Sequence, residues 1–236
     1  MNRKMQWKVS LGVLAVAFAL TLTREPAAIS RMLATVAADM NMLSFFMHGA
    51  FLAALAAGLL LPAARVRWFG GFMALLAASA ASVALGYFIL PNILVFGLYL
   101  ALILQGLWRG ELGWDLAKTS AADRLFGILG LGFGFWYLHW VQSPIMLNAL
   151  LYSPLGVVNC PTMLSISGLL CLANRRPAGL ELVSGVVCTY FGLFGIILLG
   201  AYVDVALVVC GTYQLARLAI TARRGARPEL GRLEKA

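Results

Sequence analysis

Long apolar runs constrain the fold of this chain more than any motif does. A helix needs roughly 20 mostly apolar residues to cross about 30 Å of hydrocarbon. Runs close to this length lie at 7–23, 42–62, 68–88, 91–108, 121–141, 159–174, 179–200 and 203–221. They lack the apolar–polar alternation of a membrane barrel, so their backbone must pair its polar groups within helices. The sequence therefore predicts an all-α, polytopic transmembrane helix bundle with about eight spans.

Composition agrees with a membrane protein. Hydrophobic residues make up 62% of the chain and charged residues 11%, whereas soluble domains carry about 45–50% apolar and about 25% charged residues. This departure argues against a soluble enzyme, a disordered chain and a nucleic-acid-binding domain. We therefore expect the lipid bilayer as a partner, and no nucleic acid.

The basic residues give an orientation for the eight expected spans. With that count, sixteen of the eighteen Lys and Arg residues fall on one side of the membrane, and only Arg24 and Arg31 fall on the other. Basic residues concentrate on the cytoplasmic side of membrane proteins. Both termini are therefore expected in the cytoplasm, and the net charge of +9 reflects topology.

The predicted organisation is one transmembrane domain over residues 1–221 followed by a basic cytoplasmic tail over 222–236. Residues 26–39 predict an amphipathic helix that begins at Pro26 and lies on the outer surface; a connector packed on the spans is the alternative. The first span has a basic start and a short apolar stretch, as signal peptides do. The sequence is therefore compatible with two alternatives, a first span that is retained and one that is cleaved.

Prolines break the stretch that leads into the sixth span, residues 144–161. Because the residue before a proline disfavours helix, we predict a short helix at 145–152, an irregular turn at 153–159, and a new helix from Cys160 or Pro161. Broken helices often form binding sites in transporters, although an extracellular loop resting on the bundle would show the same pattern.

Two features concern the packing of the spans. Gly130 and Gly134 form a small-xxx-small pair, which indicates a close helix contact inside the bundle or in an oligomer. Leu90-Pro91-Asn92 and Asn159-Cys160-Pro161 open two of the spans. A duplicated hairpin would explain this likeness, as would the ordinary preference for proline in a first helical turn.

The candidate site consists of polar residues that the topology places in the outer half of the membrane. Ionisable groups in hydrocarbon are costly and usually mark pathways or partners. The candidate solute-binding residues are His48, His139, Asn148, Asn159, Cys160 and Asp204. For His48, a hydrogen bond to a neighbouring helix is the alternative role. Cys160 with His139 or His48 could bind a soft metal ion, and no resident cofactor is expected.

One segment resembles a known family. The run LYSPLGVVNCPTML at 151–164, which continues to Leu170, resembles the signature of a family of uncharacterised bacterial multi-pass membrane proteins with a Cys-Pro-Thr helix start. The resemblance implies a multi-pass protein of the bacterial inner membrane. It implies no activity.

Three functions are compatible with these patterns. The first, which we favour, is a small-solute or ion transporter or channel with an outer-facing polar vestibule. The second is a non-catalytic membrane subunit or scaffold, alone as a homo-oligomer or with membrane partner proteins. The third, an enzyme that uses Cys160 as nucleophile or metal ligand, is the least supported, because the chain has no Walker A, His-Glu-x-x-His or Gly-x-Ser-x-Gly motif.

Overall fold

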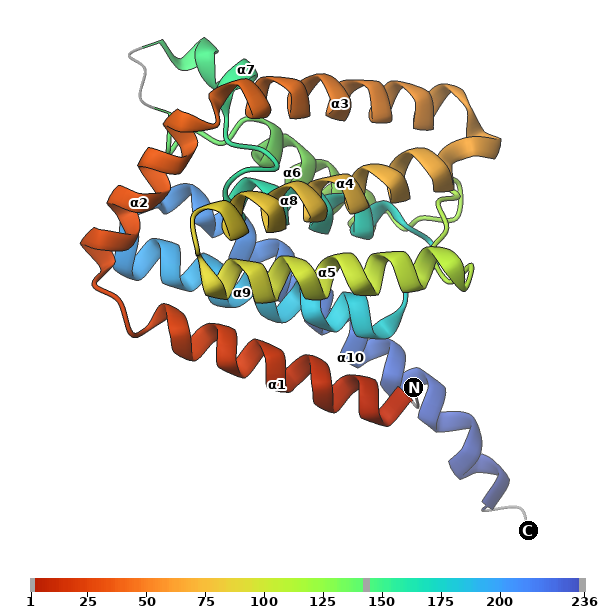
Figure 1. Ribbon diagram of the computed structural model, residues 1–236. Helices are drawn as coiled ribbons and strands as arrows, with labels where there is room; N and C mark the ends of the chain where they lie inside the picture. The colour runs from red at the N-terminus through yellow and green to blue at the C-terminus, as the bar shows by residue number, and fades with distance from the viewer. Residues whose placement is uncertain (1–2, 142–144, 234–236) are drawn as a thin grey trace.

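The computed structural model describes residues 3–141 and 145–233, and over these residues the protein is all-helical, as predicted. Most of the helices lie side by side in one bundle (Figure 1). The α-helices of the described chain are α1 (Arg3–Thr21), α2 (Pro26–Asp39), α3 (Asn41–Leu60), α4 (Arg65–Gly86), α5 (Leu90–Trp108), α6 (Ala121–Phe135), α7 (Ala149–Tyr152), α8 (Asn159–Leu172), α9 (Ala178–Leu199) and α10 (Val205–Leu233). Short 3-10 helices occupy Pro62–Ala64, Met146–Asn148 and Tyr202–Asp204.

Five or six segments of the described chain are long and apolar enough to cross a membrane. Five are single helical stretches that contain α3, α4, α5, α9 and the first part of α10. The sixth is the pair α1 and α2, if that bent pair is one span. The other two expected runs form α6 and α8, whose 15 and 14 residues reach only roughly 21–23 Å.

The two unusual segments fold as short helices. α2 covers the predicted residues 26–39, buries Leu33 and Val36, and is bent by 103° from α1. Pro144 lies outside the described residues. Beyond it, the predicted helix at 145–152 forms a 3-10 turn and α7. The irregular turn ends at residue 158, one residue earlier than predicted, because α8 begins at Asn159.

α8 is the core of the bundle. All fourteen of its residues are buried, and it contacts α4, α6, α9 and α10. At its carboxyl end, the Trp114 indole donates to the Leu169 carbonyl at 2.8 Å, and the Thr119 hydroxyl donates to the Leu172 carbonyl at 3.0 Å. A helix that ends inside the protein needs such donors, since its last carbonyls have no partner in the helix. α8 therefore ends against protein.

The irregular segment before α8 is also held by side chains. The Ser79 hydroxyl donates to the Gly156 carbonyl at 2.7 Å, and the Gly156 amide donates to the Thr162 hydroxyl at 2.9 Å. Further back, the Tyr137 amide donates to the Ser153 hydroxyl at 3.1 Å. Buried backbone groups outside helices need partners of this kind.

Glycines bring α6 and α8 into backbone contact. A Cβ atom at Gly130 would lie 2.9 Å from the Gly168 Cα and from the Leu164 carbonyl oxygen, and a Cβ at Gly134 would lie 2.8 Å from the Pro161 carbonyl oxygen. The small-xxx-small pair therefore packs inside the bundle, which was one of its two expected roles.

Replacing Gly130 by alanine should destabilise the protein. The added methyl meets backbone that cannot move aside, and overpacking of this kind costs about 1–3 kcal/mol. Gly132→Ala is the matched control, because this exposed position of the same helix has no atom within 4 Å of the new Cβ. Thermal unfolding in one detergent should show a lower midpoint for Gly130→Ala alone. Equal midpoints would contradict the α6–α8 contact.

Candidate functional site

A pocket of about 220 Å³ lies at the amino ends of α5 and α8. Its walls come from α1, α2, α9 and the α4–α5 turn, and most of them are apolar. The apolar and aromatic lining residues include Leu20, Ile29, Met32, Leu33, Phe88, Ile89, Leu90, Phe191, Phe194 and Leu199. The polar lining residues are Thr21, Thr23, Arg24, Tyr87, Asn92, Asn159 and Cys160.

The floor of the pocket carries two asparagines without complete hydrogen bonding. Asn92 and Asn159 are each only 6% exposed. Among the described residues, the Asn92 amide makes no side-chain hydrogen bond, and the only group near the Asn159 amide is the Cys160 sulfur, 3.7 Å from its Oδ1, whose single proton the closer Asp204 carboxylate accepts. Buried polar groups are normally paired. Both amides therefore have donors free for a ligand in the pocket.

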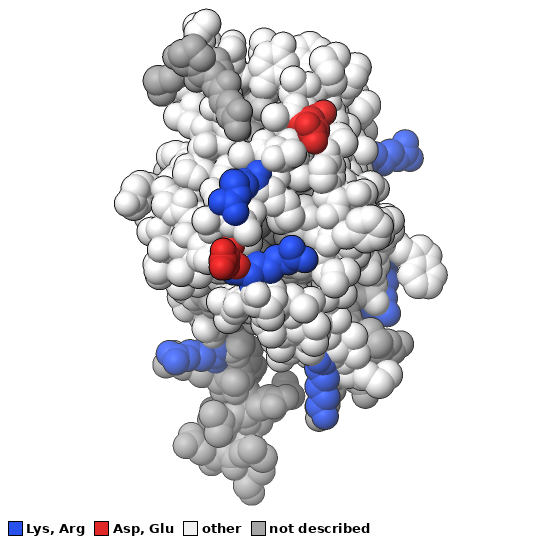
Figure 2. Space-filling model, turned by 60° about the vertical axis from the view of Figure 1, so that its left-hand side comes forward, with Lys and Arg blue, Asp and Glu red and all other residues white. Residues whose placement is uncertain are grey.

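The rim is formed by exposed residues of two turns. Arg24 follows α1, and Phe88 precedes α5 with φ of 54°, a region that non-glycine residues seldom adopt. Beside it, the Tyr87 hydroxyl donates to the Asp39 carboxylate at 2.9 Å, which ties this turn to the end of α2. That hydrogen bond raises the pKa of the Tyr87 phenol. Figure 2, with this end turned forward, shows a largely uncharged surface with scattered charged side chains.

Asp204 lies directly behind the pocket floor. It is fully buried and accepts from the Tyr137 hydroxyl at 2.6 Å and from the Cys160 thiol at 3.3 Å. Gly195, which lines the pocket, faces the same carboxylate, because a Cβ there would collide with Asp204 Oδ2. The described residues provide no cation for Asp204, so hydroxyl and thiol donors alone satisfy it.

The other three predicted site residues lie elsewhere. The His48 ring is buried, with Nδ1 2.8 Å from the Ser44 carbonyl oxygen and Nε2 2.9 Å from that of Phe135. This confirms the expected hydrogen bond to a neighbouring helix. The His139 side chain is exposed and its ring packs on Trp140, with centroids 4.4 Å apart, and the partial desolvation of its imidazole lowers its pKa. Asn148 lines a second cavity of about 310 Å³.

The structure thus joins three of the six expected residues, Asn159, Cys160 and Asp204. Sequence reasoning missed Arg24, Asn92 and Tyr137. For Asn92 a clue existed, since it follows Pro91 at a helix start much as Asn159 precedes Pro161. No group of three or more His, Cys, Asp or Glu side chains within the described ranges has a metal-binding arrangement. All four cysteines lie within those ranges, and each is free and buried.

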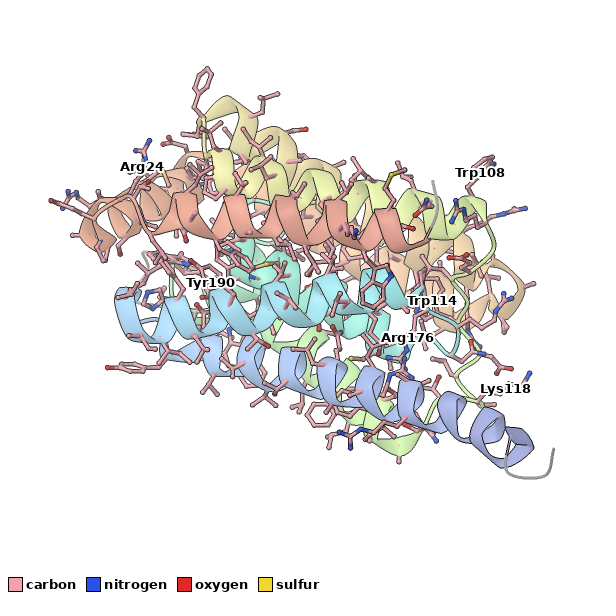
Figure 3. The ribbon with its side chains drawn as sticks, turned by 90° about the horizontal axis from the view of Figure 1, so that it is seen from below. Arg24, Trp108, Trp114, Lys118, Arg176 and Tyr190 are labelled. Atoms are coloured by element: carbon pink, nitrogen blue, oxygen red, sulfur yellow. The ribbon has the colours of Figure 1, made fainter. Side chains whose placement is uncertain are left out.

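The opposite end of the bundle is closed by a charged network, which we call the basic-end network: Asp123, Arg176, Glu181 and Arg217. Arg176 contacts Asp123 at 2.7 Å. Arg217 binds the Glu181 carboxylate through two donors, at 2.6 and 2.8 Å. The network joins α6, α9 and α10 with the α8–α9 loop. Figure 3 places Arg176 at this end with Trp108, Trp114 and Lys118, and Arg24 at the other.

The basic-end network is buried and balanced. The side chains of Arg176 and Glu181 are each 3% exposed, and that of Asp123 is 10% exposed. Two acidic and two basic groups leave no net charge. The Ser120 hydroxyl caps the amino end of α6 beside this network, because the Asp123 amide donates to it at 3.0 Å. Buried charges of this kind depend on their partners.

Comparisons of the chain with known protein families, with curated proteins and with solved structures find no match. The family resemblance of residues 151–170 stays a prediction.

Removing one partner of the basic-end network should be costly. Arg176→Met leaves Asp123 without its closest cation, and breaking a buried pair costs about 3–5 kcal/mol. Lys118→Met is the control, since its pair with Asp115 is solvent-exposed and worth about 1 kcal/mol or less. Chemical unfolding of both variants in the same micelles measures the difference. A loss for Arg176→Met no larger than that for Lys118→Met would contradict the structural role of the network.

Proposed function

We propose that the protein is a membrane transporter of small solutes and that the pocket at the amino ends of α5 and α8 is its solute site. The observation that carries the proposal is a cavity with unpaired amides at the start of a short, fully buried helix of 14 residues. Discontinuous helices with their amino ends at a solute site are a recurring device of transporters.

The proposed topology has eight crossings, with α6 and α8 as shortened ones. In this arrangement α1, α4, α6 and α9 run one way and α3, α5, α8 and α10 run the other. Figure 1 supports an even number, since the two chain ends lie toward the same end of the bundle. The basic end would face the cytoplasm of a bacterial inner membrane, so the pocket would open outward.

The two ends of the bundle support an outward-facing state of such a transporter. The pocket reaches exposed rim residues such as Arg24 and Leu90. At the other end, the basic-end network joins the elements around the carboxyl end of α8. Alternating access requires one closed and one open end, and rearranged contacts must later reverse them. Ion pairs between separate helices are contacts that can be exchanged in this way.

A scaffold is the second candidate, and the packed body of α8 favours it. Below the pocket floor, all residues of α8 are buried against other helices. A scaffold would keep that interior closed on one side permanently. The two functions therefore differ in whether the pocket floor is ever reached from the basic end.

Thiol labelling of Cys160 tests this difference. In a Cys171→Ala, Cys188→Ala, Cys210→Ala background, Cys160 is the single thiol and lines the pocket. Oriented proteoliposomes are treated with a small, charged, membrane-impermeant methanethiosulfonate from either side. Transport predicts that Cys160 is modified from both sides, because the site alternates. Modification from the pocket side only would contradict transport and favour the scaffold.

Two further variants make the result interpretable. Thr23→Cys and Lys118→Cys in the cysteine-free chain mark the exposed pocket end and basic end respectively, and each must react from one side only. Cys160→Ser gives the background. If Cys160 reacts from neither side while both markers react, the pocket is closed and the proposed site is wrong.

A further inference from the structure

We infer that the pocket binds a small carboxylate with an apolar tail. That this ligand is transported depends on the proposed function. That it binds in the pocket does not. The inference joins three properties of the pocket: a lining with one basic and no acidic side chain, unpaired amides, and long apolar walls.

The first property is the sign of the lining charges. Arg24 is the charged residue among the lining residues, and no Asp or Glu of the described chain lines the pocket. The amino ends of α5 and α8 also meet there, and neither helix has a side-chain cap. A helix amino end carries partial positive charge and free amide donors, which favour anions. The pocket therefore has the electrostatic character of an anion site.

The second property is the unpaired polar groups in the floor. Asn92 and Asn159 are buried, line the pocket and keep amide donors without a described partner. A carboxylate is a planar group with two acceptor oxygens. It can accept from both amides while the charge of Arg24 offsets its own. Helix amino ends alone would not define a site, but two buried amides left unpaired point to a ligand.

The third property is the shape and chemistry of the walls. Leu20, Met32, Phe191 and Phe194 belong to the apolar lining above the floor. The volume of about 220 Å³ equals that of roughly seven waters in the liquid, which suits a solute of about ten non-hydrogen atoms or fewer. Binding sites of this kind join apolar walls with a few polar groups that fix the ligand. A tail of about five carbons fits these limits.

The Asp204 carboxylate does not oppose this assignment. It lies behind Cys160 and Gly195 and is not itself a lining residue. Its oxygens accept from Tyr137 and Cys160, which are the titratable groups in contact with it. α9 contributes Gly195 at this point. The polar groups presented to the ligand are therefore the Arg24 guanidinium, amides, hydroxyls and a thiol.

Protection of Cys160 against a methanethiosulfonate reagent measures binding at this site in the single-cysteine protein. Hexanoate joins the carboxylate to the tail, hexan-1-ol has the tail alone, and acetate has the carboxylate alone. We expect hexanoate to slow the modification of Cys160 at least about tenfold. Half protection by hexanoate should also require a concentration at least about tenfold lower than half protection by hexan-1-ol or by acetate, since hydrogen bonds to a charged group contribute about 1.5–3 kcal/mol.

Variants assign the contacts. Arg24→Gln should raise the hexanoate concentration for half protection by about tenfold or more, and Asn92→Ala should raise it by about fivefold. Arg31→Gln is the matched control, because this exposed arginine of α2 does not line the pocket, and it should change the value less than about twofold. Equal effects of Arg24→Gln and Arg31→Gln would overturn the inference that Arg24 recognises the charge of the carboxylate.

The remaining outcomes separate the source of the ligand and the two proposals. In nanodiscs, protection by added hexanoate indicates a small soluble acid and supports the inference. Protection by octadecanoic acid in the bilayer without protection by hexanoate indicates a membrane fatty acid, which exceeds the size limit of the pocket, and overturns the inference. Equal protection by hexan-1-ol and hexanoate, or no protection by any acid, overturns it. Modification of Cys160 from both membrane sides is an independent test of transport. The transport proposal can therefore survive when the carboxylate inference fails, and the reverse.

Discussion

The fold depends on enclosing a short apolar helix in protein on every side. α8 is too short to cross a bilayer alone, so both of its ends lie where unpaired backbone groups would be costly. Trp114 and Thr119 satisfy carbonyls at its carboxyl end, and the irregular chain before it pairs its own backbone with Ser79 and Thr162. Direct backbone contact with α6 is possible because Gly130 and Gly168 have no side chains.

The electrostatics of the two ends of α8 follow from this enclosure. At the carboxyl end, four buried charges balance one another and join several helices, which closes the bundle. At the amino end, Asp204 has only neutral donors, and two asparagine amides face a cavity without partners. A closed, charge-balanced end and an open end with unused hydrogen-bond donors are what a one-sided binding site requires.

Sequence alone predicted the elements whose limits are local. Pro26 and the apolar face of residues 26–39 defined α2. The eight apolar runs all contain helices, but only five or six segments of the described chain are long and apolar enough to cross a membrane by themselves, because Trp136 ends α6 early and α8 has only 14 residues. The contact of Asp204 with Cys160 joins residues 44 apart and depends on packing that no local pattern encodes. The same is true of Arg24 and Asn92, which reach the pocket from separate turns.

The central claim is that the pocket is the open state of a site that also closes. The most direct measurement is the distance between spin labels on the two sides of its mouth, at Thr23 and Leu90, in a protein reconstituted into nanodiscs. Pulsed electron resonance should resolve two distance populations, and hexanoate should shift the balance between them. A single, ligand-independent distance would contradict alternating access and leave a static binding protein or scaffold.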